Sequence, residues 1–301
     1  MWFKQLTLFR LNPEQLPDST ALNAALSKQP FVSCAGLDWF SQGFEASVSH
    51  QPDLMVYEAN DCVLTTLRRE DKVLPASVIR DFTEQKISEI EARELRTVGK
   101  KEKSELRDQV TDDLLPRAFT RQGRTRAYLD RDSAWLVVNA GSASKAEAMV
   151  TALREALPPF PARLPKTQLA PHTAMTLWLE QGPPEGFELD ADCELKSVED
   201  DGAVVRCTRQ DLTAAEIRAH LEHGKLVTKL GLIWRERIRF VLTDTLQLKR
   251  LQFLDILQDE AEQAGDDAEA LFAATFTLMS SELRLLINEL IAALGGELPA
   301  S

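Results

Sequence analysis

The chain has 301 residues, of which 44% are hydrophobic and 27% charged, and its formal net charge is −12. This apolar fraction supports real cores and excludes a disordered, collagen-like or low-complexity protein. The uninterrupted apolar stretches are too short to span a bilayer and the first residues lack an export signal, so we expect a cytoplasmic protein with no membrane partner.

The first 74 residues alternate strand-like segments with one short helix. Asn60-Asp61 is a favourable turn pair between two strand-like runs and predicts a hairpin. A second group of strands and a helix over residues 143–157 follow after an interruption. We predict strands here at 6–11, 54–59, 62–69, 124–130 and 134–139. Residues 1–74 and 117–160 are therefore assigned to a central α/β domain.

Residues 75–116 form the interruption. Proline opens this segment, glycine is nearly absent, and charged residues surround a narrow apolar stripe. Helices with this pattern project from a body rather than fill its core. We predict a helical tip of two helices, broken near Gly99.

The proline-rich stretch 158–165 predicts a linker, and residues 161–301 are assigned to a base α+β domain with C-terminal helices. The last helix carries an apolar stripe from Phe272 to Leu294, which is typical of core or dimer packing. We predict strands in this domain at 173–179, 193–197, 203–208, 225–234, 237–242 and 246–253, and a helix at 213–222. The fold class is α+β with mostly antiparallel sheets.

No disulfide framework, metal or cofactor is expected. The cysteines Cys34, Cys62, Cys193 and Cys207 lie far apart without a Cys-x-x-Cys pair, and we interpret them as small buried hydrophobic residues. Phosphate-loop, nucleophile-elbow and zinc-protease motifs are also absent from the sequence.

The acidic excess is concentrated in two segments. Residues 180–201 carry a net charge of −8 and residues 255–301 carry −9, which leaves +5 for the rest of the chain. The positive charge follows the alternation of the predicted strands, in which successive side chains point to opposite faces. One parity is shared by Leu226, Leu230, Leu232 and Trp234 in the strand predicted at 225–234, and by Ile238, Phe240 and Leu242 in the next. The cations of opposite parity are Lys225, Lys229, Arg235, Arg237 and Arg239, and Arg124 and Arg126 share a face on an earlier strand.

Such a basic face is either an ordinary solvated surface or a surface that contacts phosphates. Cations two residues apart on a strand can meet successive backbone phosphates by releasing counterions, without reading bases. Aromatic residues do not alternate regularly with these cations, so a duplex fits better than stacked single strands. Residues 116–124 are predicted to be a loop in which Phe119 either tucks inward or contacts another subunit.

Asp192, Glu194 and Lys196 suggest an alternative, a metal-dependent nuclease. In such enzymes carboxylates hold Mg²⁺ and a lysine aids the attacking water. The motif is very short, and acidic loops also produce it by chance.

Several segments in order resemble the bacterial recombination-associated protein RdgC family, and the likeness runs through essentially the full chain. They are residues 2–4, 114–119, 194–197, 210–213, 224–230, 248–251 and 294–297. The resemblance implies a non-enzymatic, nucleoid-associated protein that binds double-stranded DNA without sequence preference. It also implies a ring-shaped homodimer around the DNA and antagonism of a RecA-type recombinase.

By position, Phe119 corresponds to the family's apolar contact where one end of the ring closes, and Arg117 to a nearby cation. Arg209 and Gln210 correspond to a Lys-Gln pair implicated in DNA contact, with arginine in place of lysine. We expect the acidic segments on the outside, where they repel DNA. The predicted DNA-binding residues are Arg117, Arg124, Arg126, Arg209, Gln210, Lys225, Lys229, Arg235, Arg237 and Arg239.

Overall fold

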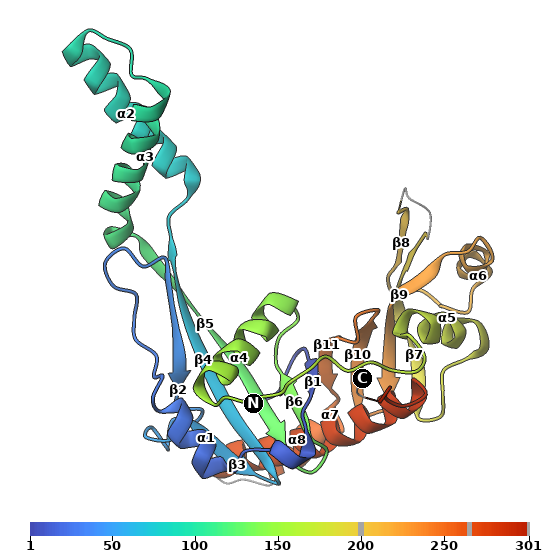
Figure 1. Ribbon diagram of the computed structural model, residues 1–301. Helices are drawn as coiled ribbons and strands as arrows, with labels where there is room; N and C mark the ends of the chain where they lie inside the picture. The colour runs from blue at the N-terminus through green and yellow to red at the C-terminus, as the bar shows by residue number, and fades with distance from the viewer. Residues whose placement is uncertain (198–201, 264–266, 300–301) are drawn as a thin grey trace.

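The computed structural model describes residues 1–197, 202–263 and 267–299. Two antiparallel sheets lie edge to edge and share one long C-terminal helix (Figure 1). The strand order is β1-β6-β5-β4-β2 in the first sheet, with β3 also paired to β4, and β11-β10-β9-β7-β8 in the second. The sheets meet where the N–H groups of Leu6 and Leu248 each donate to the other's carbonyl, at 2.7 and 3.0 Å. The α+β class with antiparallel sheets is therefore confirmed.

The first sheet is covered on one face by two helices. Its strands are β1 (Thr7–Arg10), β2 (Phe40–Glu45), β3 (Val56–Ala59), β4 (Cys62–Val73), β5 (Phe119–Asp130) and β6 (Trp135–Val138). Helices α1 (Ser19–Leu26) and α4 (Ala143–Ala156) pack with this face in one apolar cluster. A short 3-10 helix, η1 (Pro13–Gln15), precedes α1. The predicted hairpin is confirmed, because Asn60 and Asp61 adopt the positive φ angles, 53° and 57°, that a tight strand turn requires.

The predicted loop at 116–124 is wrong over most of its length. Strand β5 already begins at Phe119, and it pairs with β4 without interruption from Val73–Phe119 to Cys62–Asp130. Pairing with the twelve-residue strand β4 thus keeps residues 119–124 in the sheet, although their sequence favoured a loop. We call the paired outer ends of β4 and β5 the arm. Two helices, α2 (Ala76–Glu94) and α3 (Lys100–Leu114), project beyond it and are followed by the 3-10 helix η2 (Leu115–Arg117) (Figure 1).

The projecting helices bury little. Ile79 and Thr83 on α2, and Leu106 and Val110 on α3, are their buried residues. Helix α2 ends at Leu95, which has a left-handed backbone, and Gly99 caps the start of α3. The assignment of this segment, and of the central and base regions, to separate domains stays a prediction.

The second sheet comprises β7 (Phe187–Lys196), β8 (Val204–Cys207), β9 (Leu226–Trp234), β10 (Ile238–Thr243) and β11 (Leu248–Phe253). The predicted strand at 173–179 is wrong, because these residues belong to helix α5 (Pro171–Gln181). Proline at its start has the φ angle of a helix, and Ala174, Met175, Trp178 and Leu179 are buried with helical spacing. Helix α6 (Ala215–Glu222) precedes β9.

The longest helix joins the two sheets through a common core. Phe276 and Leu283 of α8 (Ala268–Ala293) belong to one buried cluster with Tyr128 of the first sheet and Phe240 of the second. Helix α7 (Asp255–Gln263) lies beside α8. Among the described helices, α8 alone is long and apolar enough to cross a membrane, and 44% of that window is buried inside the molecule. Its apolar stripe therefore serves the core, as expected.

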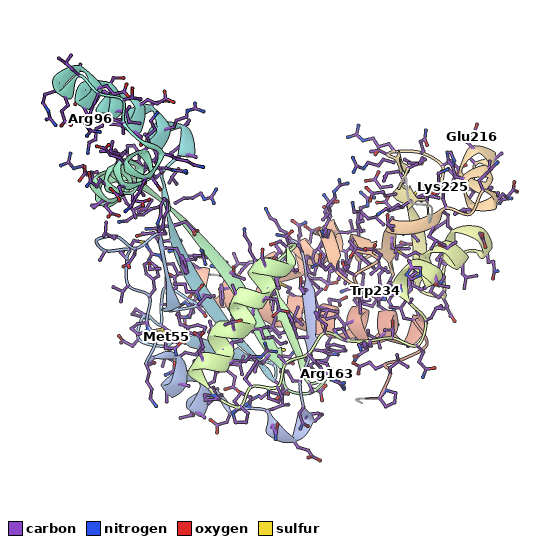
Figure 2. All side chains as sticks on the ribbon, turned by 45° about the horizontal axis from the view of Figure 1, so that its top comes forward. Met55, Arg96, Arg163, Glu216, Lys225 and Trp234 are labelled. Atoms are coloured by element: carbon purple, nitrogen blue, oxygen red, sulfur yellow. The ribbon has the colours of Figure 1, made fainter. Side chains whose placement is uncertain are left out.

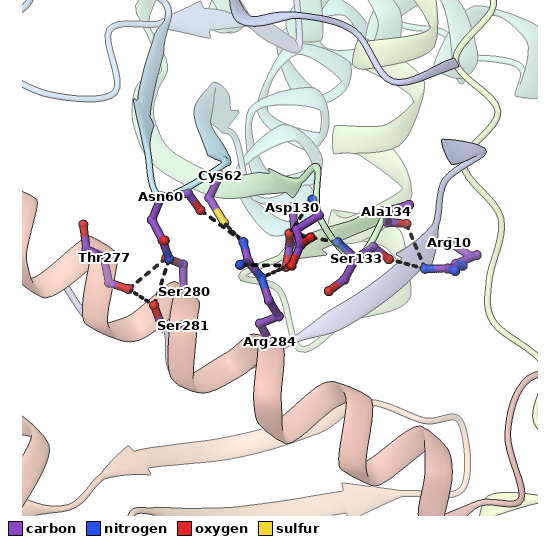
Figure 3. A network of polar contacts seen from close by, with 11 residues as sticks. Arg10, Asn60, Cys62, Asp130, Ser133, Ala134, Thr277, Ser280, Ser281 and Arg284 are labelled. Atoms are coloured by element: carbon purple, nitrogen blue, oxygen red, sulfur yellow. Dashed lines mark hydrogen bonds and ion pairs between the residues drawn. The ribbon is translucent and has the colours of Figure 1, made fainter. Parts of the chain in front are cut away.

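A polar network fastens α8 to the turns of the first sheet (Figure 3). Arg284 on α8 pairs with the buried Asp130 at 2.7 Å and donates to the Asn60 carbonyl. Burial acts to lower the pKa of Arg284, but the hydrogen bond and charge of Asp130 outweigh it and raise that pKa. Burial, with the Asp130 charge, raises the pKa of the Cys62 thiol to about 11. The arginine thus stays charged against the sheet.

Candidate nucleic-acid interface

One face of the second sheet carries charged side chains of both signs. Ile238, Phe240 and Leu242 of β10 are buried in the core shared with α8, so Arg239 and Val241 project from the opposite face. An open depression of about 350 Å³ lies on this side. Its lining comprises Asp192, Cys193, Glu194, Arg206, Cys207, Thr208, Lys229, Val241, Lys249 and Arg250.

Three carboxylates of β7 pair with cations of the other four strands of this sheet. Glu194 contacts the Lys229 ammonium at 2.9 Å and the Arg206 guanidinium at 2.8 Å. Asp192 pairs with Arg250 at 2.9 Å. Asp190 pairs with Arg239 at 3.4 Å. We call this set of residues the β7 charge cluster.

The cations form the outer layer of the β7 charge cluster. The carboxylate side chains are 16–27% exposed, whereas the cations paired with them are 41–75% exposed. Burial acts to raise the pKa of Glu194, but hydrogen bonds from Lys229 and Arg206 outweigh it and lower that pKa. The cluster therefore presents ammonium and guanidinium groups to solvent, above the less exposed carboxylates.

The parity prediction is confirmed on β10 and wrong for the turn before it. Arg235 pairs with Glu289 of α8, and Arg237 pairs with Glu282 of α8 and Glu260 of α7. Arg235 lies in a tight turn with positive φ, so strand alternation does not extend to it. Arg235 and Arg237 thus face helical carboxylates and do not share the surroundings of Arg239.

A β-bulge also breaks the parity prediction on β9. Val227 is fully buried while Leu226 is only partly buried, because the pairing with β7 shifts register between Glu194 and Leu195. Lys229 keeps its predicted place on the charged face. Lys225 precedes the strand, and its N–H donates to the His220 carbonyl. Figure 2 shows Lys225 at the outer end of this part of the molecule, away from Trp234.

Arg209 and Gln210 lie in the turn that follows β8, beside the β7 charge cluster. The Arg209 N–H donates to the Asp192 carboxylate at 3.1 Å, and the Gln210 N–H donates to the Ala191 carbonyl at 3.1 Å. Both side chains are exposed. A side chain and a backbone carbonyl of β7 thus position the two residues to which the family resemblance assigns DNA contact.

Sequence reasoning missed three cations of this face, Arg206, Lys249 and Arg250. Arg206 follows the alternation of β8, whose Cys207 is buried, so parity could have found it. Arg250 has a positive φ beside a register shift between β10 and β11, and no local sequence signal marks that irregularity. Its exposure on this face follows from the pairing of the strands.

Arg124 and Arg126 lie on the first sheet. Arg124 and the opposite Arg68 both pair with Glu45 of β2. Burial, and then the charge of Arg124, lower the pKa of the half-buried Arg126, and its Nε has no hydrogen-bond partner within the described residues. The first sheet therefore holds a second group of cations, Arg68, Arg124 and Arg126. Arg124 and Arg126 were predicted from the sequence, but Arg68 was not.

Arg117 and Phe119 stand at the junction of the arm and the projecting helices. Arg117 ends η2 and is exposed, and Phe119 begins β5 opposite Val73. The Phe119 side chain is 86% exposed. Of the two alternatives left open by the sequence, the inward-tucked side chain is wrong.

The first acidic segment contributes carboxylates to the charged face, and the expected placement of the acidic segments on the outside of a ring stays a prediction. Asp190, Asp192 and Glu194 lie among the cations of the face, while Glu260, Glu282 and Glu289 of the second segment pair with arginines. Residues 199–201, which belong to the same acidic segment, lie outside the described residues. For the nuclease alternative, Asp192 and Glu194 are each engaged by cations, and Lys196 is exposed at the end of β7.

These features define a class: an α+β protein with antiparallel sheets and a cation-rich sheet face. A family model described as "Putative exonuclease, RdgC" matches residues 1–297. Curated proteins named "Recombination-associated protein RdgC" are similar over nearly their whole length. That of Laribacter hongkongensis is 63% identical and covers 100% of both chains. That of Neisseria meningitidis serogroup C is 51% identical over 98% of this chain and 99% of its own, and that of Pseudomonas paraeruginosa is 41% identical over 99% and 98%.

The chain belongs to the RdgC family of recombination-associated proteins. The curated relatives are not named for an enzymatic activity, and the word exonuclease comes from the family description alone.

Proposed function

We propose that this protein binds double-stranded DNA without sequence preference, as a ring-shaped homodimer. The β7 charge cluster is the observation that carries the proposal. Arg206 on β8, Lys229 on β9 and Arg250 on β11 project outward from the charged face of the second sheet, beside the Arg209-Gln210 turn. Cations so arranged contact backbone phosphates and release counterions, which gives affinity without base recognition.

The location and biological role belong to the same proposal. A protein that covers duplex DNA of any sequence associates with the nucleoid in the cytoplasm. It also withholds DNA from a RecA-type recombinase, and this antagonism supports a role in recombination and replication. The recombination-associated name of the relatives agrees with that role.

The test measures binding to two duplexes of equal length and unrelated sequence at a series of salt concentrations. The fluorescence anisotropy of each labelled duplex reports the affinity. We expect the logarithm of the affinity to fall linearly with the logarithm of salt concentration, with the same slope for both duplexes. Arg250→Ala should reduce the slope by about 1, the share of one phosphate contact. Strong preference for one duplex, or binding insensitive to salt, would contradict the proposal.

The nuclease alternative requires its own assay. Plasmid is incubated with the protein and Mg²⁺, beside the Glu194→Ala variant. The engagement of Glu194 by Lys229 and Arg206 leads us to expect intact plasmid in both. Cleavage that persists through purification and is lost in the variant would instead support a nuclease with Asp192, Glu194 and Lys196 at its centre.

A further inference from the structure

We propose that Asp190, Asp192 and Glu194 compete with DNA phosphates for the cations of the β7 charge cluster and so limit affinity for duplex. This inference rests on the proposed function, because it concerns the regulation of the same face. It predicts the direction of a change in affinity. Removing a negative charge from β7 strengthens DNA binding, even though each carboxylate holds a cation in place.

The geometry makes each carboxylate a direct competitor. Glu194 engages Lys229 and Arg206 together, at 2.9 and 2.8 Å, through the same nitrogen atoms that would meet a phosphate. Asp192 likewise occupies the Arg250 guanidinium at 2.9 Å. A phosphate that binds these cations must exchange with a carboxylate already in contact or share the cation with it.

The carboxylates cannot move far away when phosphate arrives. Glu194 lies where β7 is paired with β8 on one side and with β9 on the other, so its backbone is fixed within the sheet. Asp190 and Asp192 lie between Leu189 and Cys193, where the pairing with β9 shifts register, and Asp192 is held by the hydrogen bond that it accepts from the Arg209 N–H at 3.1 Å. Glu194 also accepts a hydrogen bond from the Thr228 hydroxyl at 3.3 Å. The negative charges therefore remain beneath a bound phosphate and repel it over a distance shorter than the Debye length.

An opposing effect must be weighed against this repulsion. Ion pairs hold the long cationic side chains in position and so lower the entropy lost on binding. Arg206 and Arg250 are 75% and 74% exposed, and exposed pairs restrain such side chains only weakly. The repulsion is therefore the larger effect, and ligands with several adjacent phosphates are favoured over single anions, because they displace several carboxylates at once.

The experiment compares Glu194→Gln and Asp192→Asn with Glu289→Gln. Each substitution removes one negative charge and keeps an acceptor oxygen. At position 194 this oxygen serves Lys229, at position 192 the Arg209 N–H, and at position 289 the Trp234 indole N–H. Glu289 lies on α8 and pairs with Arg235, away from the β7 charge cluster. It therefore controls for net charge. Thermal unfolding establishes that each variant is folded.

At low salt we expect each β7 variant to bind a duplex about threefold more tightly than the unmodified protein, and the gain to shrink as salt is raised. Glu289→Gln should change affinity by a smaller factor. Equal or weaker binding by both β7 variants would overturn the inference, as would an equal gain in the control. If neither the unmodified protein nor any variant retains duplex at low salt, the proposed function itself fails.

Discussion

Glu194 shows at the scale of one residue that stability and affinity can make opposite demands. Its pKa in the folded protein lies below the ordinary value of 4.5, so the ionised form favours folding. That contribution is fully present above pH 4.5 and is lost as the pH falls through the lowered folded pKa. The same charge repels phosphate in the proposed complex. The residue therefore stabilises the free protein while weakening its contact with DNA.

This argument predicts a pH-dependent difference between the unmodified protein and Glu194→Gln. Near pH 7 the variant should be less stable by about 1 kcal/mol, since it loses its charge-assisted contacts with Lys229 and Arg206. The difference should begin to shrink near pH 4.5, where the carboxyl of the unfolded chain becomes protonated, and should be lost as the pH falls through the lowered pKa of the folded carboxyl. Urea midpoints measured from pH 3 to pH 8 check this outcome. A difference independent of pH would mean that packing, rather than charge, sets the effect.

Sequence alone located individual cations where strands are regular. The alternation of Ile238, Phe240 and Leu242 placed Arg239 on the charged face correctly. It failed at Val227, because a bulge depends on the partner strand and not on local residues. The carboxylate contacts of the cluster also join residues far apart in the chain, so no local pattern contained them.

The elements differ in how much of their structure the chain predicts. The β3–β4 turn and α8 were predictable, since Asn60-Asp61 and a long apolar stripe act locally. Helix α5 was misassigned as a strand because Thr173–Leu179 is a short, mostly apolar run, which periodicity alone does not distinguish from a buried strand, and Pro171 was not used as the start of a helix. Strand β2 was missed, because its polar residues are held by pairing with β4.

Helix α8 depends on a buried ion pair for its attachment to the first sheet. Arg284→Met should lower the free energy of unfolding by about 3 kcal/mol, because Asp130 would remain buried without its cation. Ser281→Ala is the matched control on the same helix, and it removes two exposed hydrogen bonds, the one accepted from the Asn60 amide and the one donated to the Thr277 carbonyl. Its cost should stay within about 1 kcal/mol. Urea unfolding of both variants measures the difference, and equal losses would refute a special role for Arg284.

On the scale of the whole molecule, α8 and its shared core link two regions that rise on either side of an open space (Figure 1). One chain therefore does not surround a ligand, and the proposed ring needs a second copy. The sequence predicted most of the helices and strands of this molecule. It did not predict how the two sheets join, because the bridge between Leu6 and Leu248 connects residues far apart in the chain. Phe119 and the apolar stripe of the last helix left a subunit contact open as an alternative, and the family resemblance alone implied a ring.

A closed ring makes a topological prediction. On covalently closed circular DNA it should resist a high-salt challenge better than on linear duplex of the same sequence, because a ring can slide off a free end. The Phe119 side chain, 86% exposed at the end of the arm, is the proposed apolar closure. Phe119→Ala should therefore abolish the circular advantage while leaving low-salt affinity within about twofold, since removing an exposed side chain changes no cation that meets phosphate.

Leu164→Ala provides the control for Phe119→Ala, since Leu164 is also apolar and 56% exposed but lies far from the arm in sequence. It should keep the circular advantage. Retention on circular and linear DNA is compared after the salt challenge by the amount of protein that sediments with the DNA. If the unmodified protein leaves both forms equally fast, binding does not involve encirclement. The cations would then contact DNA as an open surface, and the exposed Phe119 would require another partner.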